Sequence, residues 1–198
     1  RAGAATVRVG RRSCRVAAGT PLAGLAAVRR AGGPAFRLRD YGSCSRRVRD
    51  AASLFVTRIG RDANRNQDGW VYKVGARVGS GGAADAAGPF GNRRLLRTGD
   101  RLLWFWCVSG RTGCQRTLAV SAPRAVPAAG TLTVRVRGFD DRGRGVAVAG
   151  ATVTAGERTA TTGADGTAAL PGPWSGTITV SASKRGLVPS FPEEVLAG

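Results

Sequence analysis

The sequence predicts two domains, a small α+β domain in residues 1–115 and an all-β sandwich in residues 116–198. Three observations support this division. A single helical pattern stands among strand patterns in the first part, whereas the second part contains only short alternating strands separated by turns. The first part also carries 22 of the 31 basic residues, and thus +16 of the net charge of +19.

The first domain is expected to begin with a β-hairpin and a helix. Residues 6–9 alternate apolar and polar side chains, and residues 13–17 supply a matching strand. Thr20 is a good N-cap and Pro21 suits the first helical position, so a helix is predicted from there to the glycine pair at 32–33. This helix would cover one face of a sheet.

Further strands are predicted at residues 36–38, 53–60, 69–75 and 102–108. The last of them contains three large aromatic residues in a row. Because side chains alternate along a strand, Trp104 and Trp106 share one face and Phe105 lies on the other. Both faces are apolar, which predicts that both are covered.

The helix and the neighbouring strand are the expected neighbours of these aromatic residues. We expect Phe105 to face Leu22 and Leu25 of the helix. The two tryptophans would then lie on the opposite face, beside Trp70 and Tyr72, since aromatic pairs on adjacent strands stabilise a sheet.

The second domain follows a simpler pattern. In residues 131–138, Leu132, Val134 and Val136 are expected to face inward, and residues 177–183 repeat the alternation. Residues 164–166 have the composition of a hairpin turn. These short strands predict a β-sandwich.

The four cysteines, Cys14, Cys44, Cys107 and Cys114, indicate two disulfides in an exported protein. The chain contains no C-x-x-C spacing and no histidine, which argues against a zinc site. Cys107 and Cys114 flank a short glycine-containing turn, so we expect them to pair, which leaves Cys14 for Cys44. No run of apolar residues is long enough for a transmembrane segment, and an extracellular location, secreted or at the cell surface, is expected.

No catalytic residues, metal site or cofactor is expected. Without histidine, the Ser-His and Cys-His nucleophile arrangements are excluded. Residues 62–69 alternate oxygen-bearing side chains as calcium loops do, but Gln67 and Lys73 stand where such a loop needs Gly and Glu. An Asn/Asp turn between strands is the better interpretation.

The basic residues are scattered and form no nucleic-acid motif, so no specific nucleic-acid partner is expected. The positive charge fits either a solvated basic surface or a polyanion partner, because clustered arginine raises the local concentration of anions.

Two sets of motifs resemble known families. LFVTRIG, GWVYKVG and TGDRLLWFW, in this order, resemble the transcobalamin-like C-terminal domain, a bacterial β-grasp domain of unknown function. One departure is that Gly75-Ala76 stands where the family usually has Asn-Gly. The resemblance implies a β-grasp fold in residues 1–115 and ligand binding. The domain that holds a corrinoid in transcobalamin-type proteins has no counterpart here.

The second set lies in residues 116–198. GATVTAG, TTGADGTAAL and GTITVSASKRG are similar to bacterial immunoglobulin-like and carboxypeptidase-regulatory-like (prealbumin-like) sandwiches. These modules act as spacers on exported proteins, and the resemblance implies no catalysis.

Together these observations predict an exported, non-enzymatic binding protein. A small ligand or a cell-envelope component, including a polyanion, would bind the first domain at Trp70, Tyr72, Trp104 and Trp106. The alternative is a structural surface-display or adhesion module with no small-molecule ligand. A cleft beside the four aromatic residues would favour binding, and their complete burial would favour the structural alternative.

Overall fold

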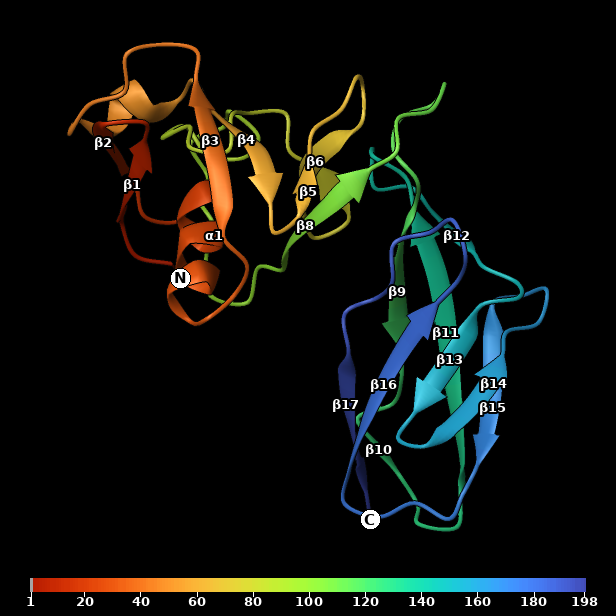
Figure 1. Cartoon of the computed structure of the whole chain (residues 1–198). Coiled ribbons are helices and arrows are strands. Elements are labelled where there is room, and N and C mark those ends of the chain that lie inside the picture. Colours follow the sequence, from red (N-terminus) through yellow and green to blue (C-terminus); the bar gives the residue numbers. More distant parts are fainter. Residues whose placement is uncertain (1) are drawn as a thin grey trace. The chain divides into compact units, whose positions relative to one another are not determined.

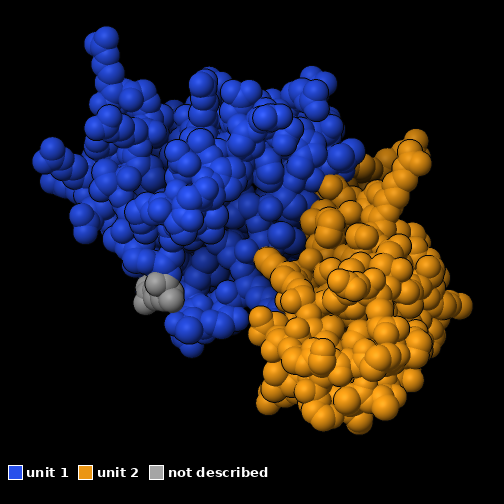
Figure 2. Space-filling view, turned by 60° about the horizontal axis from the view of Figure 1, so that its bottom comes forward, with its two compact units in different colours: residues 1–109 blue, residues 110–198 orange. Residues whose placement is uncertain are grey.

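The computed structural model describes residues 2–198, and the chain divides into two compact units, residues 1–109 and residues 110–198 (Figure 2). Most of the regular structure in both units is β-strand, arranged in several sheets. The boundary lies a few residues before the expected one at 115/116. A tight turn, in which Gly110 and Gly113 pair through their main chains, already belongs to the second unit.

The first unit combines the helix with short strands in three small sheets (Figure 1). Its elements are β1 (Ala5–Val9), β2 (Arg12–Val16), α1 (Pro21–Arg30), β3 (Phe36–Asp40), the 3₁₀ helix η1 (Val48–Ala51), β4 (Leu54–Ile59), β5 (Asp62–Ala63), β6 (Gly69–Val74), β7 (Arg77–Val78) and β8 (Leu102–Cys107). β1 pairs with β2, β4 lies between β3 and β5, and β6 lies between β7 and β8. The sequence predicted one sheet here, and residues 2–109 of the structure instead contain three.

Helix α1 begins where the sequence predicts it, because Thr20 and Pro21 suit its first turn. The hydroxyl oxygen of Thr20 accepts a hydrogen bond from the N–H of Ala23 at 3.3 Å, which satisfies one of the free donors at the helix start. Leu22 and Leu25 are buried in a core that also contains side chains of β1, β2 and β4. This packing anchors the helix in the first unit.

The second unit consists of nine strands in two sheets among its described residues (Figure 1). They are β9 (Thr117–Ser121), β10 (Ala125–Val126), β11 (Thr131–Phe139), β12 (Gly145–Ala147), β13 (Thr152–Ala155), β14 (Arg158–Thr161), β15 (Thr167–Pro171), β16 (Thr177–Ser183) and β17 (Glu193–Ala197). One sheet has the order β10-β17-β16-β13-β14. In the other, β11 pairs with β9, β12 and β15.

One hydrophobic core lies between these two sheets. β11 contributes Leu132, Val134 and Val136, which are fully buried, as the alternation predicts. Ile178 and Val180 of β16 enter the same core from the other sheet. The second unit therefore has the two-layer arrangement of a β-sandwich.

The turn at residues 164–166 joins two sheets, so the hairpin expected there is wrong. β14 before the turn pairs with β13, whereas β15 after it pairs with β11. Thr162 is buried between them; its hydroxyl accepts a hydrogen bond from the N–H of Ala151 at 2.9 Å and donates one to Val148 O at 2.6 Å. These bonds hold the chain where it leaves one sheet for the other. Turn composition alone does not specify the partner strand.

Both expected disulfides are present. Cys14 in β2 is bonded to Cys44, which closes a loop that contains α1 and β3. Cys107 and Cys114 are also disulfide-bonded, and the described chain contains no free cysteine. The pairing is therefore the one that the spacing of the cysteines predicts.

Candidate binding site

The four aromatic residues singled out in the sequence lie together on one face of the β6–β8 pair. Trp70 is opposite Trp106, with ring centroids 5.8 Å apart and nearly perpendicular planes. Tyr72 is opposite Trp104, with centroids 5.3 Å apart. The predicted grouping of these four side chains is confirmed.

The direction in which this face points differs from the prediction. Tyr72 belongs to the core that surrounds α1, and the indole N–H of Trp104 donates to Pro21 O at 3.4 Å. Phe105, which was expected against the helix, is buried on the opposite face, where the Lys73 ammonium lies 5.6 Å from its ring centroid. Alternation fixes which side chains share a face, but it does not specify which face the helix covers.

A half-open pocket of about 510 Å³ lies beside the aromatic face. It is lined by Tyr41, Ala52, Ser53, Leu54, Phe55, Val56, Trp70, Val71, Tyr72, Val78, Gly79, Ser80, Gly81, Gly82, Ala83 and Trp104. Three of the four predicted residues therefore border one pocket. Its wall is mostly apolar, and the glycine-rich segment at residues 79–82 closes one side.

Tyr72 forms part of the wall and is not an exposed stacking platform. The residue is only 6% exposed, and its hydroxyl donates to Gly81 O at 2.6 Å. Burial, together with the nearby Asp85 carboxylate, raises the pKa of Tyr72 to about 12. Gly79 lies directly on the phenol ring, where any side chain would clash. Tyr72 thus fixes the glycine-rich segment at the edge of the pocket.

Trp70 and Trp104 are partly exposed, whereas Trp106 lies outside the pocket. The indole N–H of Trp70 donates to Asp62 O at 2.8 Å, which holds the ring in place. Trp106 contacts Trp70, and the guanidinium of Arg65 lies 5.8 Å from its ring centroid. Trp106 therefore supports Trp70, and the structure does not bring it to the pocket.

Sequence reasoning missed two aromatic residues at the mouth of the pocket. Tyr41 is 64% exposed and Phe55 45% exposed, and their rings meet edge to face with centroids 6.1 Å apart. The guanidinium of Arg39 lies 4.8 Å from the Tyr41 ring centroid. Phe55 occupies an outward position in an alternating strand, and that exposed aromatic is the signal that could have identified it.

A second hollow adjoins the first and is basic. Tyr41, Phe55, Trp70 and Val71 line both pockets. The second, of about 700 Å³, is also lined by the arginines Arg37, Arg39 and Arg58 and by one acid, Asp68. The Asp68 carboxylate already accepts a hydrogen bond from the N–H of Ser109 at 2.8 Å. An apolar pocket thus continues into a hollow with an excess of positive charge.

The side chain of Asn64 connects β4 to β6 beside both pockets. Its amide nitrogen donates to Val56 O at 3.0 Å, and its amide oxygen accepts from the N–H of Trp70 at 3.1 Å. Asn64 lies in the segment that was predicted as an Asn/Asp turn. The sequence pattern of that segment is similar to a calcium loop, but the Asn64 side-chain oxygen accepts a main-chain hydrogen bond and so has a structural role.

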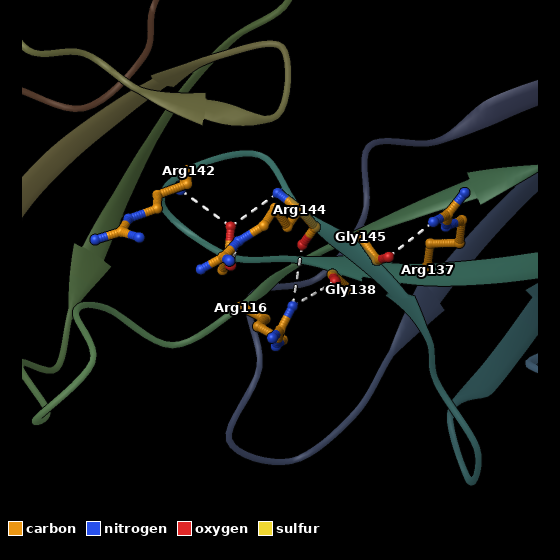
Figure 3. Close-up of polar contacts among 7 residues, drawn as sticks. Arg116, Arg137, Gly138, Arg142, Arg144 and Gly145 are labelled. Atoms are coloured by element: carbon orange, nitrogen blue, oxygen red, sulfur yellow. Dashed lines mark hydrogen bonds and ion pairs between the residues drawn. The ribbon is translucent and has the colours of Figure 1, made fainter.

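Arginines of the second unit have a different role (Figure 3). Arg116 donates to Gly138 O and Arg144 O, each at 3.1 Å, and Arg137 donates to Gly145 O at 2.7 Å. These bonds fasten the turn between β11 and β12. The guanidinium groups of Arg116 and Arg137 bond to carbonyl groups of their own unit, and that of Arg144 pairs with the Asp140 carboxylate at 3.2 Å, so these contacts do not suggest a ligand site.

Comparisons with known proteins identify no family. No protein-family model matches the chain, and no curated protein is significantly similar to it. Within residues 2–198, no group of three or more His, Cys, Asp or Glu side chains is placed to hold a metal ion. In the same residues, no helix has the length and apolar character needed to cross a bilayer.

Proposed function

We propose that the protein is an exported, non-enzymatic binding protein whose first unit takes a ligand in the pocket beside Trp70, Tyr72 and Trp104. The observation that carries this proposal is the pocket itself. It is concave and mostly apolar, and exposed Tyr41 and Phe55 stand at its mouth. Such pockets are the usual sites of small-ligand binding.

The charge beside the pocket narrows the ligand class. The adjoining hollow contains three arginines and one acid, which favours a ligand that joins an apolar part to an anionic group. A cell-envelope component of that chemistry would fit.

We include in the proposal a β-grasp fold for the first unit and an immunoglobulin-like or prealbumin-like sandwich for the second. The helix packed beside strands, and the two facing sheets, support these assignments.

Two disulfides and the lack of a membrane-spanning helix within the described residues fit an extracellular protein. The second unit would then act as a spacer. Arg116 and Arg137 bind carbonyl groups of β11, β12 and the turn between them, which is consistent with a structural role.

A polyanion partner is a second candidate, supported by a separate basic cluster. Arg15 of β2 and Arg46, Arg47 and Arg49 line an open hollow in the first unit. A flexible polyanion would bind there through charge alone, so its retention should fall steeply with salt. Chromatography of the full chain on heparin checks this, and retention that does not change with salt would exclude it.

The pocket can be tested with anilinonaphthalene sulfonate, a dye that joins aromatic rings to an anionic group. Wild-type protein should enhance its fluorescence in a saturable manner. Ala52 is exposed and lines the pocket, so Ala52→Phe should fill the space and weaken dye binding at least tenfold.

Ala86→Phe is the matched control, because Ala86 is exposed in the same unit and does not line the pocket. It should bind the dye as wild type does. Equal binding by the two variants, or no saturable binding by the wild type, would contradict the proposed site and favour a structural module without a ligand.

A further inference from the structure

One face of the β3–β4 pair carries the three arginines that line the basic hollow. Arg37 and Arg39 are exposed on β3, and Arg37 is the cross-strand partner of Arg58 on β4. Like charges that lie opposite each other on two paired strands repel. Within residues 2–198, none of these three side chains takes part in an ion pair. An anion bound between them would relieve the repulsion.

A β-bulge in β4 adds a hydroxyl group to this face. Arg58 lies opposite Arg37, but the next residue of β3 lies opposite Val56, so Thr57 is the extra residue. Side chains of an unbulged strand alternate between its two faces, and a bulge re-aims them. Thr57 and Arg58 consequently both line the hollow, although they are neighbours in the sequence. Bulges of this kind occur often beside functional sites.

Two amide side chains at the edge of the hollow have free hydrogen-bonding groups. Arg65 and Asp68 exchange main-chain hydrogen bonds at 2.9 and 2.8 Å, which makes Asn66 and Gln67 the tip of a tight turn. Both amide side chains are exposed, line the hollow and form no hydrogen bond with the described part of the chain. Each amide group offers two donors and an acceptor oxygen. These groups are suited to the hydroxyl groups of a ligand.

Aromatic rings complete the lining of the hollow. Phe55 is the cross-strand partner of Arg39, and Tyr41 follows the end of β3. The Arg39 guanidinium lies 4.8 Å from the Tyr41 ring centroid, and this cation–π contact holds the cation in place. Partly exposed Trp70 lines the same hollow. Aromatic rings offer an apolar surface on which the C–H face of a sugar ring can pack.

We infer that the basic hollow binds an oligosaccharide that carries carboxylate groups, such as a chain of uronic acids. This inference rests on the proposed binding function and specifies the ligand class of the hollow. A sugar acid combines the three chemistries found there: carboxylates pair with guanidinium groups, hydroxyl groups with amides, and C–H faces with aromatic rings. The volume of about 700 Å³ lies within the usual range of ligand sites, about 300–1,000 Å³.

The polar lining distinguishes a sugar acid from a simple anionic amphiphile. An acyl chain with one carboxylate would leave the amides of Asn66 and Gln67 unused, whereas a sugar offers hydroxyl groups to both. The carboxylate of Asp68, the acid among the lining residues, is already engaged by the N–H of Ser109 at 2.8 Å. The guanidinium of Arg58 is oriented by its bond to Arg61 O at 3.2 Å. The positive charge of the hollow is therefore directed to a ligand.

Isothermal titration calorimetry of the full chain with α-1,4-linked tetragalacturonate tests the inference. The matched ligand is the methyl ester of the same tetrasaccharide, which keeps the sugar rings and removes the charges. At physiological salt, the wild-type protein should bind the acid at least tenfold more tightly than the ester. Equal affinity for the two ligands, or no binding of the acid, would overturn the inference.

Variants separate recognition in the hollow from general attraction of a polyanion. Arg39→Gln should weaken binding of the acid several-fold, whereas Arg47→Gln, which removes the same charge from the separate basic cluster, should not. Phe55→Ala should weaken the acid and the ester alike, because it removes an exposed ring and no charge. Phe191→Ala, at an exposed ring of the second unit, is its control. Equal effects of the two arginine variants, or undiminished binding by Phe55→Ala, would overturn the inference.

The dye experiment on the apolar pocket gives an independent outcome, because Ala52 lines that pocket and not the hollow. If the dye binds and Ala52→Phe blocks it while the acid does not bind, the pocket stands and the oligosaccharide inference fails. If the acid binds as described and the dye does not, the inference is supported and the apolar pocket fails as a ligand site. If neither binds, both fail.

Discussion

Tyr72 illustrates how a residue chosen as a ligand contact can instead hold the site together. Its hydroxyl bonds to Gly81 O, and its ring lies against Gly79. The main-chain segment that closes the pocket is therefore attached to β6 through one side chain. Under the proposed binding function, ligand contact would be left to the partly exposed rings of Trp70 and Trp104 and to the exposed rings at the mouth.

Tyr72→Phe should lower the free energy of unfolding by about 1 kcal/mol, because it removes one buried hydrogen bond and leaves Gly81 O without that donor. Urea denaturation followed by tryptophan fluorescence measures the change. Tyr41→Phe, at an exposed tyrosine, is the control and should leave stability unchanged. A neutral Tyr72→Phe variant would show that the hydroxyl bond does not hold the segment.

Asp40 is a second residue whose role depends on its environment. Its carboxylate accepts hydrogen bonds from the N–H groups of Cys44 and Gly42 and from the Ser53 hydroxyl, and Arg12 Nη1 lies 3.5 Å away. The N–H of Cys44 is the largest of the causes that lower the pKa of Asp40 below its usual 3.8. One carboxylate therefore joins β2, the end of β3, the Cys44 loop and the residue before β4.

This lowered pKa predicts a pH dependence with a defined sign. The ionised carboxylate stabilises the fold fully above pH 3.8, and this contribution is lost as the pH falls through the lower folded-state pKa. Asp40→Asn should cost about 1–3 kcal/mol at pH 7, and the difference from wild type should shrink below pH 3.8. Urea titrations from neutral to acidic pH measure it, with the exposed Asp62→Asn as control. A difference that grows in acid would contradict this assignment.

Among the elements, β6 and β8 show what the sequence can and cannot predict. Strict alternation places Trp70, Tyr72, Trp104 and Trp106 on one face, and this follows from the sequence alone. The side that faces α1 depends on tertiary packing, and the expectation for Phe105 was wrong for that reason.

The pocket itself could not be predicted from local patterns. It exists because β4 and β6 run close together without pairing, and a strand pattern does not reveal which edges stay unpaired. Tyr41 and Phe55 reach its mouth from positions that are separate in the sequence. The bridge by Asn64 also depends on the missing side chain of Gly69, which becomes meaningful only in three dimensions.

Gly69→Ala should therefore disturb both strands at once. The added methyl group would displace the Asn64 carboxamide and leave Val56 O and the N–H of Trp70 without their partners, at a cost of about 1–3 kcal/mol. Asn64→Ala should cost a similar amount, because it removes the same two bonds. Gly3→Ala, where nothing lies within 4 Å, is the neutral control in urea denaturation. A stable Gly69→Ala protein would show that the bridge is dispensable.

For the whole molecule, the division into two units predicts that a destabilising substitution in one unit leaves the stability of the other unit unchanged. The Cys14–Cys44 bond closes a loop with a sequence separation of 30 residues. The double variant Cys14→Ser/Cys44→Ser should destabilise the first unit by about 3–4 kcal/mol, because the unfolded chain gains freedom. The core of the second unit contains neither cysteine.

Hydrogen exchange followed by mass spectrometry resolves the two units in the intact chain. In the double variant, peptides from β1, β2 and β4 should exchange faster, while peptides from β11 and β16 should keep their protection. An equal loss of protection in both units would contradict independent stability.

The arginine bias leaves the chain with only two lysines, and they differ completely in accessibility. Lys184 is exposed, with its ammonium donating to Ala149 O, whereas Lys73 is fully buried against the ring of Phe105. An amine-acylating reagent should therefore modify the folded protein at Lys184 and reach Lys73 only when the first unit opens. The rate at which Lys73 becomes acylated would then report the rate of that opening in the native sequence, with no substitution introduced.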